Sequence, residues 1–124
     1  MKLVIPLLLL MQQTAFANLV EVSFYTKASA KSEGTSGEYT ASGERFHEDR
    51  QTCAHPFLPF GTILKVTNPE NGIWIYCRVN DRGPASWTKR ALDLTPKGFK
   101  LLKIPQKQGI AKLEVKIKEQ GNGK

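Results

Sequence analysis

The residues with the clearest capacity for chemistry lie in the segment RVNDRGP, residues 78–84. Asp81 and Arg82 follow an apolar, β-branched run and precede the turn signal Gly83-Pro84. A charge at the end of a buried strand is costly unless it is paired or hydrogen-bonded. One explanation is structural, with Asp81 pairing with Arg82 or capping the turn. The other is catalytic, because burial or a neighbouring acid raises the pKa of a carboxylic acid and lets it deliver a proton near neutral pH.

Three further ionisable side chains could join such a site. They are Glu44 in TASGERF, His55 in TCAHPFLPFGT and Asp93 in ALDLT. Each also has a structural explanation: a surface turn for Glu44, a buried histidine for His55, and the cap of a following helix for Asp93. Spacing alone does not show that these residues converge. If the strand continues through Asp81 and Arg82, those two side chains point to opposite faces.

The N-terminal residues predict export. Residues 1–17, MKLVIPLLLLMQQTAFA, combine an early lysine, a short apolar run and alanines at the spacing of a signal-peptidase site. The apolar run is shorter than the roughly 20 residues that span a bilayer, so we expect a cleaved leader and no stable membrane insertion. We therefore expect one domain at residues 18–117 and a flexible tail at 118–124, in a protein of the periplasm or the exterior.

Cys53 and Cys77 are the two cysteines of the chain. An even cysteine count in an exported protein favours a disulfide. Zinc is the alternative, but His47 and His55 are the only nearby partners and there is no Cys-x-x-Cys pair. We predict the disulfide, no metal and no cofactor.

A formal net charge of +7 predicts attraction to anionic polymers. The basic residues form no block with interleaved aromatics of the kind that binds single-stranded nucleic acid, so we expect no nucleic-acid partner. Charge does not otherwise identify the polymer. We expect a monomer.

The elements that must position these groups are mostly strands. Alternating patterns predict strands at residues 20–26, 62–67, 73–79, 90–94 and 111–118, and Asn71-Gly72 predicts a hairpin turn. TPKGFKLLK, residues 95–103, predicts one short helix capped by Thr95. The polar stretch 27–38 is expected to be a loop. Short strands with little helix indicate an all-β barrel or sandwich.

The motifs TASGERF, CAHPFLPFGTILKVTN, NG, RVNDRGP and ALDLT closely resemble, in content and order, the rare lipoprotein A domain. The resemblance implies a six-stranded double-psi β-barrel with one or two short helices. It also implies a lytic transglycosylase that cuts peptidoglycan glycan strands at the β-1,4 bond between N-acetylmuramic acid and N-acetylglucosamine, leaving a 1,6-anhydro product.

By the same resemblance Asp81 is the catalytic acid and base, and Glu44 and His55 orient the sugar or tune Asp81. Substrate binding would fall to Tyr25, Phe46, Arg82 and Asp93. Trp87 is a further candidate for stacking on a sugar ring. Tyr25 occupies a position where relatives carry an aromatic, although SFYTKAS lacks the glycine that usually follows it.

Two other functions remain open. The same barrel serves expansin-like modules, which bind or loosen polysaccharide without cutting it, and basic inhibitors of barwin-like shape. Fold alone does not separate these from the enzyme.

Overall fold

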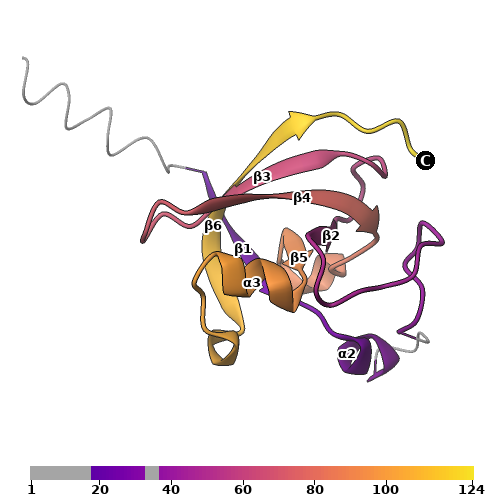
Figure 1. The fold of residues 1–124 in the computed structure, drawn as a ribbon, viewed down its shortest axis with the longest axis horizontal. Helices are drawn as coiled ribbons and strands as arrows, with labels where there is room; N and C mark the ends of the chain where they lie inside the picture. The colour runs from indigo at the N-terminus through magenta and orange to yellow at the C-terminus, as the bar shows by residue number, and fades with distance from the viewer. Residues whose placement is uncertain (1–17, 33–36) are drawn as a thin grey trace, which may run out of the picture.

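The structure is a computed structural model that describes residues 18–32 and 37–124 (Figure 1). The expected leader, residues 1–17, lies outside this part of the chain and stays a prediction. In the two described ranges no helix is both long enough and apolar enough to cross a membrane.

Six strands close into a barrel, in the spatial order β1-β5-β2-β4-β3-β6. Two neighbouring pairs, β1 with β5 and β2 with β4, are parallel, and the other four are antiparallel. The closed mixed barrel confirms the all-β prediction, and closure pairs the edges that an open sheet would expose. The strands are β1 (Leu19–Phe24), β2 (Thr52–Ala54), β3 (Ile63–Thr67), β4 (Trp74–Asp81), β5 (Leu92–Leu94) and β6 (Ile110–Glu119).

The alternating patterns predicted β1, β3, β4, β5 and β6 but not β2. Three residues are too few for alternation to be recognised, and β2 exists because it pairs with β4 on one side and β5 on the other. The predicted helix is α3 (Pro96–Leu101), where the side chain of Thr95 accepts a hydrogen bond from the Gly98 N–H. Single-turn helices η1 (Ser86–Thr88) and η2 (Gln106–Gln108) follow β4 and α3.

The stretch 27–38 differs from the loop that we expected, because it begins with the helix α2 (Lys27–Ser32). Thr26 and Ser29 cap this helix reciprocally. The Ser29 N–H donates to Thr26 Oγ1 at 3.1 Å, and the Thr26 N–H donates to Ser29 Oγ at 2.8 Å. This is the capping-box arrangement with serine in place of the usual Glu or Gln, which is why the sequence signal was missed.

The barrel interior is apolar and contains the disulfide. Along β4, Ile75, Cys77 and Val79 point inward and are buried, whereas the intervening residues point outward. Cys53 and Cys77 are bonded, with their Cα atoms 5.9 Å apart, which confirms the predicted pairing. In a model based on chain entropy, closing a loop with a sequence separation of 24 residues stabilises the fold by about 3 kcal/mol.

The C-terminal residues, expected to be flexible from residue 118, are held at several points. Strand β6 continues to Glu119. Beyond it, the Gly121 N–H donates to Thr62 Oγ1 and the Gly123 N–H donates to the Phe60 carbonyl, each at 3.0 Å. A Cβ atom at Gly121 would lie 2.3 Å from the Thr62 nitrogen, so the close approach requires glycine.

Candidate active site

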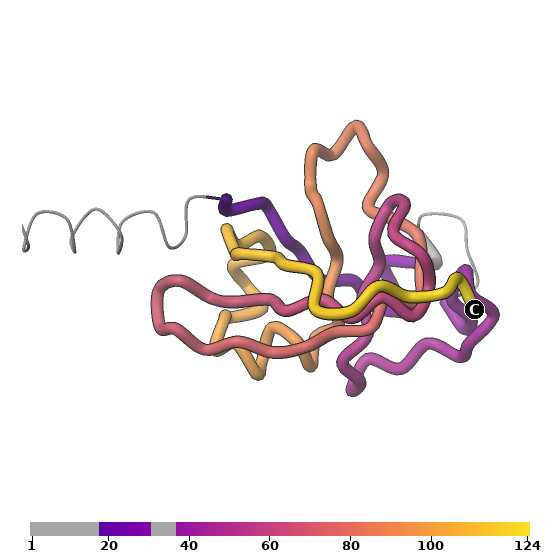
Figure 2. Tube along the Cα trace, turned by 90° about the horizontal axis from the view of Figure 1, so that it is seen from above, coloured from indigo at the N-terminus to yellow at the C-terminus, as the bar shows by residue number. Residues whose placement is uncertain are grey.

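A groove of about 970 Å³ lies where β4 and β5 meet the loops around residues 37–46 and 82–90. Figure 2 shows the segment that follows β4 projecting from the body of the barrel. This projecting segment, which includes η1, forms one wall of the groove. Asp81 and Arg82 both line the groove. They would point to opposite faces if the strand continued through both residues, but β4 ends at Asp81.

A β-bulge sets the position of Asp81. Cys53 pairs with Val79, but the next residue of β2, Ala54, pairs with Asp81, so Asn80 is the extra residue. Ala54 also pairs with Asp93 on its other side. Neighbouring strands lie about 4.8 Å apart, so the two aspartates stand about 10 Å apart at Cα, one on each side of a small alanine. All three residues line the groove.

The Asp81 carboxylate is fixed through one oxygen. Its Oδ1 accepts the backbone N–H of Ala41 at 2.8 Å and that of Arg82 at 2.9 Å. No backbone N–H in the described ranges donates to Oδ2, and the Tyr25 hydroxyl lies close enough to the carboxyl group to hydrogen-bond to it, so Oδ2 is the oxygen that can carry a transferable proton. Asp81 thus caps the turn, as one structural explanation required, but leaves its second oxygen available.

The Arg82 guanidinium does not pair with Asp81. It lies over the Phe60 ring, with 4.0 Å between the guanidinium carbon and the ring centroid. Its Nη1 donates to the His55 carbonyl at 3.3 Å. The ion pair between Asp81 and Arg82 that the sequence allowed is therefore not formed.

Tyr25 and Phe46 stack on each other in the groove wall, with ring centroids 4.6 Å apart and 19° between the planes. Phe46 is only 2% exposed and one face of its ring is covered, so little of it remains for a sugar. The Tyr25 hydroxyl is buried beside the Asp81 carboxyl group and interacts with it through a hydrogen bond that falls short of regular geometry. Burial, followed by the negative charge of Asp81 close by, raises the pKa of Tyr25 well above its usual value, so the hydroxyl stays a proton donor.

Asp93 is buried, with 8% of its surface exposed, and accepts a hydrogen bond from the Ser23 hydroxyl. Ser23 is its partner on β1 in the strand register. The helix cap expected of Asp93 is made by Thr95 instead. Asp93 therefore places a second carboxyl group in the groove, and its negative charge also contributes to the raised pKa of Tyr25.

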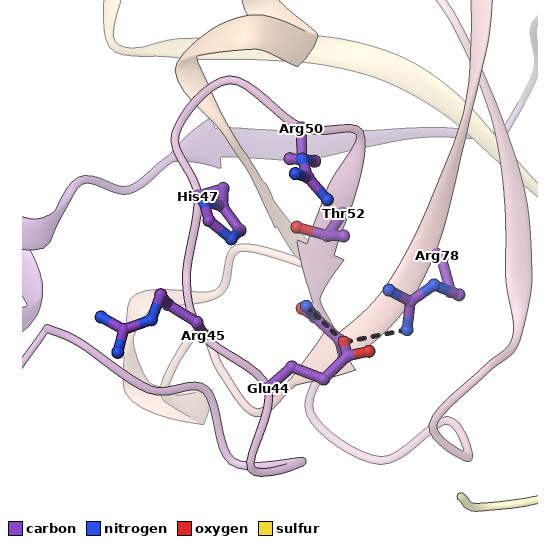
Figure 3. Close-up of a pocket in the computed structure, with 7 residues that line it drawn as sticks. Glu44, Arg45, His47, Arg50, Thr52 and Arg78 are labelled. Carbon is purple, nitrogen blue, oxygen red and sulfur yellow. Dashed lines mark hydrogen bonds and ion pairs between the residues drawn. The ribbon is translucent and has the colours of Figure 1, made fainter.

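Glu44 occupies a separate pocket of about 310 Å³ beside the groove (Figure 3). Its Oε1 accepts hydrogen bonds from Arg78 Nη1 at 2.9 Å and from Asn80 Nδ2 at 3.0 Å. These bonds, that from Arg78 above all, lower the pKa of Glu44 and keep it ionised. Together with the bond from the Ser42 N–H to the Asn80 carbonyl, they fasten the turn at residues 40–44 to β4. That turn carries the Ala41 N–H to Asp81.

His55 is also absent from the groove lining. Its Nδ1 accepts the N–H groups of Phe57 at 3.2 Å and Leu58 at 3.1 Å. Burial and the nearby positive charge of Arg82 lower its pKa, so the ring is neutral and carries its proton on Nε2. The His55 backbone N–H donates to the Asp81 carbonyl at 3.1 Å. His55 thus stabilises the turn that holds the backbone of Asp81.

The groove therefore gathers Asp81, Asp93, Tyr25, Phe46 and Arg82, while Glu44 and His55 support it from outside.

Sequence reasoning missed the Ala41 N–H, which leaves no side-chain signal. It also missed Asn80, although that residue stands in the same motif as Asp81. Besides Tyr25 and Phe46, two exposed aromatic side chains stand in the groove walls: Trp87, which is 83% exposed, and Tyr39, which is 57% exposed. In the part of the chain that is described, no three His, Cys, Asp or Glu side chains are grouped to hold a metal ion.

Comparison with known proteins agrees with this architecture. The Streptomyces papain inhibitor superposes with a TM-score of 0.57 at 22% identity, over 81% of this chain and 92% of the inhibitor. This likeness identifies the fold as a double-psi β-barrel.

Curated relatives are similar over part of their length. The probable endolytic peptidoglycan transglycosylase RlpA of a Nostoc species is 37% identical over 82% of this chain and 27% of its own length. The endolytic peptidoglycan transglycosylase RlpA of Rickettsia felis is 33% identical over 79% of this chain and 42% of its own. This chain thus spans less than half the length of either relative. Residues 18–115 match the lytic transglycolase family, and the chain belongs to that family.

Proposed function

We propose that this protein is a peptidoglycan lytic transglycosylase that cleaves the β-1,4 bond between N-acetylmuramic acid and N-acetylglucosamine and forms a 1,6-anhydro product. The observation that carries the proposal is the Asp81 carboxyl group in the groove, with Oδ1 fixed by two N–H donors and Oδ2 without one. Family membership and the names of the relatives support the substrate class.

The proposed reaction needs one carboxyl group. Asp81 Oδ2 gives its proton to the glycosidic oxygen as the bond from that oxygen to C1 of the muramic acid breaks. The Ala41 and Arg82 N–H groups stabilise the carboxylate that results. The carboxylate then takes the proton of the muramic acid 6-hydroxyl, whose oxygen bonds to C1. No water is consumed, and no metal or cofactor is required.

The groove walls provide the contacts for the glycan. Trp87 and Tyr39 expose aromatic surface on which sugar rings stack. Arg82 and Arg90 line the groove and bring positive charge to the carboxylates of the substrate. Glu44 and His55 act as positioning residues, since each holds a segment that contacts Asp81. We place the protein outside the cytoplasmic membrane, where this polymer lies, and expect it to act as a monomer.

The decisive experiment incubates purified sacculi with the protein and identifies soluble products by mass spectrometry. We expect anhydro-muropeptides from the wild type and a loss of about 10²- to 10⁴-fold in Asp81→Asn, the range typical of a lost general acid. Asp49→Asn is the matched control, because Asp49 is exposed and does not line the groove.

Unchanged release by Asp81→Asn would refute the assignment of this residue. Wild-type protein that sediments with sacculi but releases nothing would instead identify a non-catalytic, expansin-like binding module.

A further inference from the structure

The outer face of β4 carries an exposed row of aromatic and basic side chains that the groove does not use. Because successive strand residues alternate, Trp74, Tyr76 and Arg78 point outward while their neighbours fill the core. Trp74 is 47% and Tyr76 38% exposed. None of the three lines the groove. We call Trp74, Tyr76 and Arg78, with Lys65 and Arg50, the β4 track.

The aromatic end of the track lies over the β3–β4 hairpin. The rings of Trp74 and Tyr76 have centroids 5.0 Å apart and are inclined by 58°, so they present separate surfaces rather than one flat platform. Lys65 pairs with Tyr76 in the register, and its Nζ lies 4.7 Å from the centroid of the Trp74 ring. Aromatic surface and positive charge are therefore in contact at this end.

The basic end opens into the Glu44 pocket. Arg78 lines that pocket together with Arg45, His47 and Arg50, whose side chains surround it in Figure 3. Glu44 pairs with Arg78 and Glu38 with Arg45. Within the described ranges, Arg50 and Lys65 form no ion pair, so the track presents uncompensated positive charge at each end.

The track continues towards the groove. The Arg45 guanidinium lies 5.1 Å from the centroid of the Tyr39 ring, and its Nη2 donates to the Tyr39 hydroxyl at 3.1 Å. Tyr39 belongs to the groove wall. An extended polymer could therefore contact the aromatic end, the basic pocket and the groove in succession.

We propose that the β4 track is a second binding surface for peptidoglycan, which holds the sacculus while a glycan strand occupies the groove. Sugar C–H faces match the exposed rings, and stem-peptide carboxylates match Arg50 and Lys65. The identity of the polymer rests on the proposed function. Single-stranded nucleic acid also offers bases that stack and negative charge, so the test below includes an oligonucleotide that distinguishes it from peptidoglycan as the ligand.

The test measures binding and turnover separately. Binding is sedimentation with purified sacculi, with every variant built on Asp81→Asn so that the polymer stays intact. Turnover of a short soluble glycan is measured on the same substitutions with Asp81 intact. The aromatic variant is Trp74→Thr with Tyr76→Thr, since threonine is favoured in strands. The charge variant is Lys65→Gln with Arg50→Gln, and its matched control is Lys100→Gln with Lys107→Gln, two exposed lysines outside the track.

We expect either track variant to weaken sedimentation by about tenfold, while soluble turnover stays within about twofold of wild type. The lysine control should bind as wild type does. Circular dichroism confirms that each variant is folded. Wild-type sedimentation by both track variants would overturn the proposal, as would displacement of the protein from sacculi by a single-stranded oligonucleotide. If Asp81→Asn still releases product, the proposed function fails. The β4 track is then still tested by whether the track variants sediment less with sacculi than the wild type does.

Discussion

Replacing Tyr25 by phenylalanine tests the chemistry of the groove most directly. The substitution keeps the ring that stacks on Phe46 and removes only the hydroxyl. In the free protein this hydroxyl is buried beside the Asp81 carboxyl group, and its hydrogen bond to that group falls short of regular geometry. Because so weak a hydrogen bond offsets little of the cost of burying the hydroxyl, its removal should leave the free energy of unfolding within about 1 kcal/mol of the wild-type value.

The activity should fall. When Asp81 gives up its proton, the neighbouring Tyr25 hydroxyl can donate a hydrogen bond to the new carboxylate. Hydrogen bonds to charged groups contribute about 1.5–3 kcal/mol, which corresponds to a loss of about 10- to 100-fold in kcat for Tyr25→Phe. The raised pKa of Tyr25 keeps the hydroxyl protonated throughout the working pH range.

Two assays decide the matter: urea unfolding for stability, and release of anhydro-muropeptides from sacculi for activity. Tyr39→Phe is the matched control, because Tyr39 also lines the groove but is 57% exposed, and we expect less than about a threefold effect there. A Tyr25→Phe protein that is clearly destabilised, yet fully active, would show that the hydroxyl has a structural role and would refute the reasoning.

Two further predictions concern the supports of the site. Reduction of the Cys53–Cys77 disulfide should lower the free energy of unfolding by about 3 kcal/mol, measured by urea titration with and without reductant; an unchanged midpoint would contradict the entropic estimate. His55 should titrate below its ordinary value of 6.5, as followed by NMR. Because the folded protein then binds fewer protons than the unfolded chain, the His55 contribution to stability is complete above pH 6.5 and is lost as pH falls below it. His55→Gln should reduce this pH dependence, and an equal acid sensitivity in that variant would assign the effect to other groups.

Much of the barrel was predictable because strand periodicity is local. The alternation along residues 73–79 identified the inward row of β4, and the even cysteine count, in a chain expected to be exported, identified the disulfide. The end of that strand also marked Asp81 as a residue whose environment needed explanation. Failures occurred where local signals are short, as in β2, or unusual, as in the Thr26–Ser29 cap of α2.

The sequence by itself determined five of the six strands, that Cys53 and Cys77 pair, and that an acid stands at the end of β4. Only the tertiary structure decided what surrounds that acid. Barrel closure and the bulge at Asn80 place Asp93 across Ala54 from Asp81 and bring the Tyr25 hydroxyl near both, while Glu44 and His55 turn to hydrogen bonds outside the groove. The physical reason is that periodicity fixes the face on which a side chain lies, whereas register between strands distant in sequence fixes which side chains meet.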